Sequence, residues 1–259
     1  MKIRHRTLFL SDVHLGSMHS RADELERLLM KLDFEKLYLV GDIVDLLEMD
    51  RRWRWTDACD RVVHRILELA RHGVPVVYVP GNHDEAARHL VGSEIGGIPV
   101  RLSDIHETAD GRRLLITHGD QYDSPEKMES FLHRLGSDTY NLLLRVNGAI
   151  SRMRRFFRLP YWSFAAFFKD QLPVVGRHAK DFAAELTAEA AEKGCDGVVC
   201  GHIHNAECRP GEISYYNCGD WVESFTALVE RYDGGLELVN GMAFAEDLAE
   251  PRFIESEAY

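Results

Sequence analysis

Five short apolar runs in this chain of 259 residues each end in a polar cluster. The clusters are Asp12-Val13-His14, Gly41-Asp42, Gly81-Asn82-His83-Asp84, His118-Gly119 and Gly201-His202-Ile203-His204. Short apolar runs bounded by glycine are typical of buried strands. In an open α/β sheet, ligands bind outside the carboxyl ends of the strands. We therefore expect all five clusters to meet at one edge of a sheet.

The residue types in these clusters indicate a metal site. Carboxylate, amide oxygen and imidazole are ligands for divalent metals of intermediate hardness. Two such cations about 3.5–4 Å apart can clamp a phosphoryl group and activate water. The pair needs a shared anionic ligand because two dications at that distance repel each other, and Asp42 is placed for that role. A single Asp or His after a strand is more often a turn residue, so the prediction depends on the five clusters together.

The order and approximate spacing of the clusters resemble the complete signature of the calcineurin-like metallophosphoesterases. The resemblance covers about residues 7–122 and 181–242. It implies an α/β fold, a four-layer αββα sandwich of mixed sheets, and two divalent metal ions, manganese with iron or zinc as alternatives. The implied metal ligands are Asp12, His14 and His204 for one ion, Asn82, His118 and His202 for the other, and Asp42 for both.

His83 and Asp84 are the predicted catalytic residues. His83 is similar to the phosphate-contacting histidine of that family, and it would stabilise developing charge or protonate the leaving oxygen. Asp84 would either orient that imidazole or order the loop. Two roles are open for Asp45 and Glu48. Their carboxylates either support the metal ligands from behind or belong to a solvated face of the loop.

The predicted domain organisation is a core of residues 1–120 and 181–245, a helical cap insertion at 121–180 and a tail at 246–259. The insertion contains an arginine cluster followed directly by seven aromatic residues. Either the aromatic side chains form the cap's own core, or an amphipathic cap contacts lipid. On the second alternative, the substrate-binding residues are Arg154, Arg155, Trp162 and Phe164.

A two-metal core with a helical insertion before the last cluster is similar to the UDP-2,3-diacylglucosamine hydrolases. Those enzymes cleave a pyrophosphate linkage, releasing UMP and a lipid phosphate, commonly with manganese. They typically carry Arg where this chain has His83, so a hydrolase of a different nucleotide or small phosphoester is the alternative. A catalytically silent metal-binding scaffold is an alternative of another class, against which the full set of ligand types argues.

Composition restricts the partners and the compartment. The formal net charge of −11 makes nucleic acid an unfavourable partner, since phosphate-backbone binding needs a basic surface. A phosphoester or a nucleotide-linked lipid is the expected substrate. The five scattered cysteines, without a C-x-x-C pair, indicate reduced thiols. We expect a cytoplasmic protein that contacts the inner membrane peripherally through the cap. Among the remaining histidines, His19 and His178 are the two that could touch substrate.

Strands alternate with helices in the first part of the chain, and strands dominate the end, which predicts a mixed α/β sandwich. Ser20 and Thr56 are the expected N-caps of two helices. The pattern predicts a loop between residues 42 and 55 and a helix at Asp181–Lys193 that ends before Gly194. The predicted strands are Thr7–Leu10, Lys36–Val40, Pro75–Val79, Gly197–Cys200, Ile213–Asn217, Glu223–Glu230 and Leu236–Val239.

Overall fold

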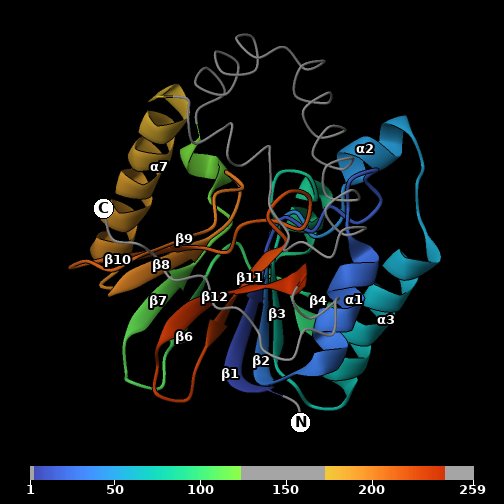
Figure 1. The fold of residues 1–259 in the computed structure, drawn as a ribbon, viewed down its shortest axis with the longest axis horizontal. Helices are drawn as coiled ribbons and strands as arrows, with labels where there is room; N and C mark the ends of the chain where they lie inside the picture. Colours follow the sequence, from blue (N-terminus) through green and yellow to red (C-terminus); the bar gives the residue numbers. More distant parts are fainter. Residues whose placement is uncertain (1–2, 124–172, 243–259) are drawn as a thin grey trace, which may run out of the picture.

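A computed structural model describes residues 3–123 and 173–242 of the chain. Two five-stranded mixed sheets face each other (Figure 1). The first has the order β12-β11-β1-β2-β3 and contains β1 (Ile3–Leu10), β2 (Leu32–Val40), β3 (Val76–Val79), β11 (Thr226–Glu230) and β12 (Leu236–Asn240). The second has the order β6-β7-β8-β10-β9 and contains β6 (Asp104–Glu107), β7 (Arg113–Ile116), β8 (Gly197–Cys200), β9 (Glu207–Arg209) and β10 (Ser214–Asn217).

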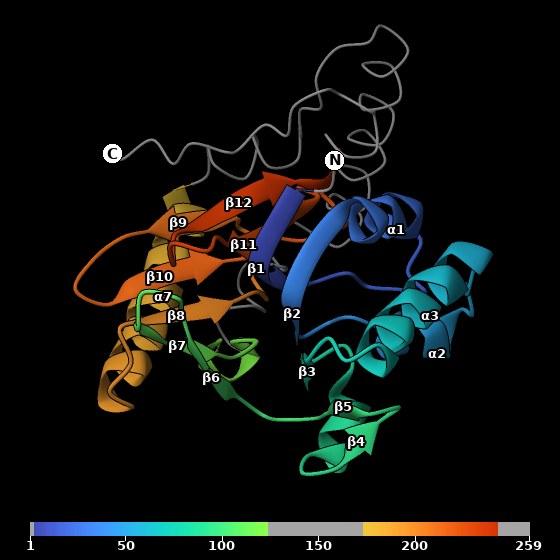
Figure 2. The same ribbon diagram turned by 90° about the horizontal axis from the view of Figure 1, so that it is seen from below.

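Helices cover the outer faces of the two sheets (Figures 1 and 2). On the first sheet lie α1 (Ala22–Lys31) and α3 (Asp57–Arg71), and on the second lies α7 (Pro173–Glu192). This arrangement confirms the predicted four-layer sandwich. The remaining elements are α2 (Leu46–Arg51), the hairpin of β4 (Glu94–Ile95) and β5 (Ile98–Pro99), and the 3₁₀ helices η1 (Glu85–Leu90) and η2 (Asp120–Tyr122).

Three apolar layers follow from the alternation of side chains along the strands. In β1, Leu8 and Leu10 pack toward α1 and α3, while Phe9 faces the second sheet. In β7, Ile116 faces the first sheet and Leu115 packs with α7. Each fully buried side chain of this size contributes about 1.5–3 kcal/mol relative to an exposed one. The central strands are therefore fixed on both faces, which makes their ends a rigid platform.

Parallel pairing brings the polar clusters to one edge of the sandwich. In the first sheet, β1, β2 and β3 are parallel neighbours, and in the second sheet β7 and β8 are parallel. The polar clusters follow the carboxyl ends of these five strands. The observed register thus produces the convergence that the sequence predicts.

The helix starts agree only partly with the prediction. Thr56 caps α3, with its side chain accepting a hydrogen bond from the backbone N–H of Cys59, as predicted. The prediction that Ser20 caps α1 is wrong. Its hydroxyl instead donates to the carbonyl of Val13 at 2.8 Å, and Arg21 occupies the N-cap position without a side-chain bond. Because the Ser20 hydroxyl bonds to the preceding loop, no side chain caps the start of α1.

Two segments hold more helix than the sequence pattern predicts. Within the predicted loop lies α2, capped by Asp45, whose carboxylate accepts from the backbone N–H of Glu48 at 2.9 Å. The last helix, α7, begins at Pro173 rather than Asp181, and proline is well tolerated in a first helical turn. Arg154, Arg155, Trp162, Phe164 and the tail at 246–259 lie outside the described residues. In the two described parts of the chain, no helix combines the length and the apolar character needed to cross a membrane.

Candidate metal centre

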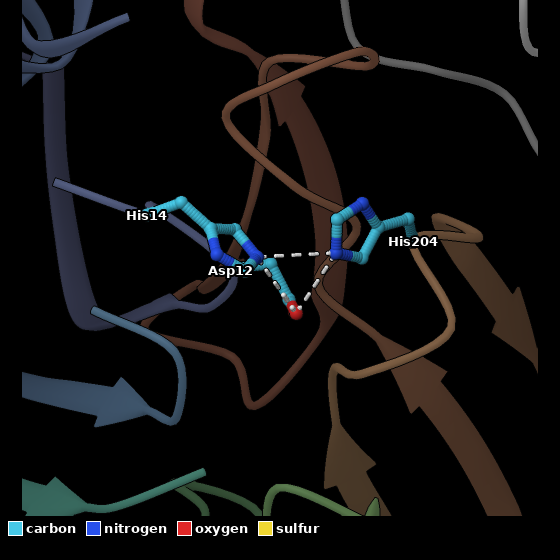
Figure 3. Close-up of side chains that lie close together, drawn as sticks. All are labelled: Asp12, His14 and His204. Atoms are coloured by element: carbon cyan, nitrogen blue, oxygen red, sulfur yellow. Dashed lines mark hydrogen bonds and ion pairs between the residues drawn. The ribbon is translucent and has the colours of Figure 1, made fainter. Parts of the chain in front are cut away.

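Asp12, His14 and His204 converge on one point between the sheets (Figure 3). Nε2 of His204 lies 3.2 Å from Oδ1 of Asp12 and 3.3 Å from Nε2 of His14. Nε2 of His14 lies 3.9 Å from the same carboxylate oxygen. With metal–ligand bonds of about 2.0–2.2 Å, ligands of one ion have separations of this size. The three side chains therefore form a ready donor set for a single cation.

A second cluster contains Asp12, Asp42 and His118. Nε2 of His118 lies 3.3 Å from Oδ2 of Asp42, and the same oxygen lies 3.9 Å from Nε2 of His14. On the far side of the ring, Nδ1 of His118 bonds to the carbonyl of Val40 at 2.9 Å, which fixes the ring orientation. Asp12 is thus common to both clusters, and Asp42 of the second cluster lies close to His14 of the first.

Two polar atoms at the centre of these clusters, Oδ1 of Asp12 and Nε2 of His118, are buried without a well-directed hydrogen bond. Their nearest polar neighbours are themselves candidate ligands, Nε2 of His204 at 3.2 Å and Oδ2 of Asp42 at 3.3 Å. Buried polar atoms are normally satisfied by a partner, and a bound ion is one such partner. Oxygen and imidazole nitrogen donors suit a divalent cation, and the residues present therefore fit the two-metal site that the clusters imply.

Asn82 and His202 extend the second cluster. Nδ1 of His202 lies 3.1 Å from the side-chain oxygen of Asn82, and its ring meets that of His118 edge-on, with centroids 5.3 Å apart. The backbone N–H of His202 donates to Asp12 at 3.0 Å. All seven sequence-predicted ligands are thereby brought together.

The backbone is strained where these ligands sit. Five of them, and otherwise only Phe225 among the described non-glycine residues, have a positive φ. The five are Asp12, His14, Asp42, His202 and His204, with φ between 49° and 70°. A non-glycine residue in this region costs on the order of 1–3 kcal/mol and persists where the surroundings enforce it. The candidate ligands are therefore held in place at a local cost in stability.

Two glycines make room for the ligands. A Cβ atom at Gly41 would overlap the ring of His118, and at Gly81 it would overlap the carboxylate of Asp42. Gly41 also has a φ of +80°, which glycine adopts without strain. These glycines therefore allow the close approach of the strand ends as well as the turns.

Electrostatics at the site favour a bound cation. Burial alone would raise the pKa of Asp42, but the rings of His118 and His14 hold it below its usual range. Burial opposes the charged form of His118, yet Asp42 and Asp12 raise its pKa to about 10. The imidazole of His118 and the buried carboxylates thus stabilise each other's charged forms.

Asp45 links the metal cluster to His83. Its carboxylate is buried and lies 2.9 Å from Nδ1 of His83 and 3.1 Å from Nδ1 of His14. Burial lowers the pKa of His83, but the bond to Asp45 and the charge of Asp42 outweigh it and raise that pKa overall. Of the two alternatives left open for Asp45, the carboxylate behind the ligands is the one observed.

Asp84 orders the loop. Its carboxylate accepts hydrogen bonds from the backbone N–H groups of Gly81 at 2.6 Å and Ile43 at 2.8 Å. It also accepts from the hydroxyl of Tyr78 at 2.5 Å. Burial raises the pKa of Asp84, and the nearby Asp42 carboxylate raises it further. The ring of His83 is oriented by Asp45 instead, so of the two predicted roles of Asp84 the loop-ordering one fits.

Asp123 is a functional candidate that the sequence analysis missed. Its carboxylate lies 3.1 Å from Nε2 of His202 and 3.6 Å from Nε2 of His178. Burial raises the pKa of Asp123, but these two rings lower it overall. A carboxylate on the second nitrogen of a ligand histidine fixes its tautomer and ring orientation. Its only signal in the sequence is its place shortly after the His118 cluster.

Solved structures of similar shape include two proteins with low sequence identity. Vps29 from Entamoeba histolytica aligns with a TM-score of 0.44 and 13% identity, covering 90% of this chain and 89% of that one. YfcE, a phosphoesterase from E. coli, aligns with a TM-score of 0.41 and 19% identity, covering 89% of this chain and 95% of that one.

Three sequence relatives bear the name UDP-2,3-diacylglucosamine hydrolase. The protein from Histophilus somni is 30% identical over 121 residues, 44% of this chain and 49% of the relative. The protein from Porphyromonas gingivalis is 28% identical over 142 residues, 51% of this chain and 53% of the relative. The chain thus spans about half the length of these two. The protein from Xanthomonas campestris is 25% identical over 265 residues, 88% of this chain and 96% of the relative.

A family match covers most of the chain. Residues 5–206 match the family described as calcineurin-like phosphoesterases. The matched stretch contains all five polar clusters and every residue of the buried donor sets. The chain belongs to the calcineurin-like phosphoesterase family.

Proposed function

We propose that this chain is a hydrolase that uses two metal ions to cleave a phosphoester or pyrophosphate bond. The observation that carries the proposal is the convergence of two buried donor sets. Both contain Asp12, and Oδ2 of Asp42 in the second set lies 3.9 Å from Nε2 of His14 in the first. Two cations held there would activate water and stabilise the charge that develops on the phosphoryl oxygens.

The proposed ligands are Asp12, His14 and His204 for one metal, Asn82, His118 and His202 for the second, and Asp42 for both. Manganese is the proposed metal, with iron or zinc as alternatives, since the donor set of oxygen and imidazole suits all three. Metal analysis of protein purified without added metal distinguishes them.

His83 is the proposed general acid. Asp45 occupies its Nδ1, which leaves Nε2 as the ring atom available to a substrate oxygen. A raised pKa keeps more of the ring protonated near neutral pH, the form that can donate a proton to the leaving oxygen. The ring is about one third exposed, so a bound phosphoester can reach it.

The proposed substrate is a pyrophosphate-linked nucleotide that carries a lipid, resembling UDP-2,3-diacylglucosamine of lipid A synthesis. The names of the three relatives support this choice. A different nucleotide or small phosphoester is the second candidate, because His83 stands where that branch typically has Arg. Peripheral contact with the inner membrane from the cytoplasmic side is proposed to involve the insertion, through Arg154, Arg155, Trp162 and Phe164.

A substrate panel tests the proposal. Manganese-loaded protein should hydrolyse UDP-diacylglucosamine faster than a small chromogenic phosphodiester, and a chelator should abolish both activities. Activity on the phosphodiester alone would favour the second candidate. Replacing Trp162 and Phe164 with Ser should raise KM for the lipid substrate only. A metal-loaded protein that cleaves no phosphoester in the panel would favour the silent scaffold.

A further inference from the structure

A cavity of about 420 Å³ lies between the first turns of α1 and α3. None of the residues that line it belongs to the metal clusters. The lining includes Ser17, Arg21, Asp23, Glu24, Arg27 and Arg54. Both helices start at the edge of the first sheet where the metal clusters lie, because each runs back from a strand end to the start of the next strand (Figure 1).

Three arginines line this cavity, Arg21, Arg27 and Arg54. Arg21 and Arg54 are half-buried, and their Nε atoms are buried without a hydrogen-bond partner. The guanidinium carbon of Arg21 also lies 5.5 Å from the centroid of the Phe225 ring, a contact that supplies no acceptor to Nε. A buried N–H without an acceptor costs free energy, which an acceptor on a bound ligand would recover. Guanidinium groups match carboxylate and phosphate oxygens with paired N–H donors.

The start of α1 adds further donors. The first N–H groups of a helix have no partner within the helix, and at α1 no side chain caps them. Ser20, which could have capped them, bonds to Val13 instead. An uncapped helix start attracts anions through free N–H groups and the helix dipole.

Acidic residues do not cancel the positive charge of the lining. The lining holds two carboxylates, Asp23 and Glu24, against three arginines. Asp23 also lies 2.8 Å from Nη2 of Arg61, whose guanidinium group Asp23 shares with Glu26. In a chain with a net charge of −11, this local excess of positive charge is unusual.

The cavity shares a wall with the metal centre. The backbone N–H of Arg21 donates to the carbonyl of Trp221, and the N–H of Trp221 donates to the carbonyl of Asp12. Ser17 likewise donates from its backbone to the carbonyl of His14. Two backbone hydrogen bonds through Trp221 therefore connect Arg21, which lines the cavity, to the candidate metal ligand Asp12.

We propose that this cavity binds a phosphate group at a site separate from the metal centre. The occupant is either a second phosphate of the substrate or free inorganic phosphate. The cavity would hold it with the guanidinium groups of Arg21 and Arg54 and the free N–H groups of α1. Binding there does not require hydrolysis, so the site is tested independently of the proposed function.

Sulfate is a suitable probe because it resembles phosphate and is not a product of the reaction. The thermal unfolding midpoint of the metal-loaded full chain should rise with sulfate at constant ionic strength, and the rise should saturate. Arg21→Gln and Arg54→Gln should each weaken the apparent sulfate affinity about tenfold, the effect of losing one charged hydrogen bond. Arg71→Gln, at the far end of α3 and outside the lining, should leave the affinity unchanged. If Arg21→Gln folds poorly, Arg54→Gln on the loop before α3 still reports.

Kinetics then identify the source of the phosphate. If the substrate supplies it, Arg54→Gln raises KM for a pyrophosphate-linked nucleotide but not for a phosphodiester with one phosphate. If it is free phosphate, the two KM values keep their ratio in the variant while the sulfate effect is still lost. Either result supports the site. An equal sulfate response in wild type, Arg21→Gln, Arg54→Gln and Arg71→Gln would overturn it.

Discussion

Oδ1 of Asp45 lies 2.9 Å from Nδ1 of His83, so the proposed general acid is held by a carboxylate outside the five polar clusters. The other oxygen of Asp45 lies 3.1 Å from Nδ1 of His14. One side chain therefore fixes the ring of a proposed metal ligand and the ring of the proposed acid. Asp45 thereby holds the rings of His14 and His83 next to each other.

Replacing Asp45 with Asn should lower kcat by about 10–100-fold, the usual effect of removing a carboxylate that orients a ligand histidine. The loss should be accompanied by a change in the pH profile. Activity that needs protonated His83 is lost as the pH rises through the pKa of that ring, and Asp45 raises this pKa. The alkaline limb of kcat should therefore shift to lower pH in Asp45→Asn. Glu48→Gln, on the helix α2 that Asp45 caps, is the control and should keep both the kcat and the pH profile of the wild type.

Replacing Asp123 with Asn should weaken metal binding at the position of His202. The ring would lose the acceptor that lies 3.1 Å from its Nε2. We expect about 10–100-fold weaker affinity for one of the two metal ions, measured by competition with a chelator. Asp181→Asn removes an exposed carboxylate from α7 and should leave both affinities unchanged. Equal affinities in Asp123→Asn and Asp181→Asn would remove Asp123 from the site.

A buried network around Glu230 should contribute to stability at acid pH. Burial raises the pKa of Glu230, but hydrogen bonds from His106, Thr7 and Arg6 outweigh it and lower the value from 4.5 to about 2. A carboxylate with a lowered pKa stabilises the fold above its unfolded value and loses that effect as the pH falls through its folded value. The free energy of unfolding should thus fall by about 3 kcal/mol between pH 5 and pH 2 because of this group.

The variant Glu230→Gln tests that prediction by urea unfolding at several pH values. It should be less stable than wild type at pH 7, and the difference should shrink as the pH approaches 2. Glu107→Gln, an exposed neighbour on β6, is the matched control. A constant difference between Glu230→Gln and wild type across the whole range would contradict the role given to the Glu230 carboxylate.

The sequence pattern predicts the mixed α/β sandwich and the polar residues at the strand ends, whereas the four layers are what the family resemblance implies. Short apolar runs predict buried strands, and strand ends predict where polar side chains gather. Leu8, Phe9 and Leu10 illustrate why, since a strand buried on both faces is apolar at every position. The Thr56 cap follows from residue type, because a threonine just before a helix commonly accepts a hydrogen bond from the backbone N–H three residues later.

What the sequence could not show depends on tertiary contacts. Ser20 has the residue type of an N-cap, but the carbonyl of Val13 competes for its hydroxyl. Asp45 reaches His14 and His83 because the preceding loop turns at Asp42. Asp42 has a φ of 54°, which the sequence pattern does not predict. Asp123 meets His202 only because η2 and the loop after β8 pack together, although they are far apart in the chain. Long-range pairs of this kind have no periodic signature.

The central claim is that Asp42 is shared by two metal ions, and the metal content of Asp42→Ala tests it most directly. Wild-type protein saturated with manganese and then dialysed should retain two ions per chain by elemental analysis. Asp42→Ala should lose occupancy at both positions together with its phosphoesterase activity, because each position loses the same anionic ligand. Asp33→Ala, which removes an exposed carboxylate from β2, should retain two ions. Two ions per chain in folded Asp42→Ala would contradict the account.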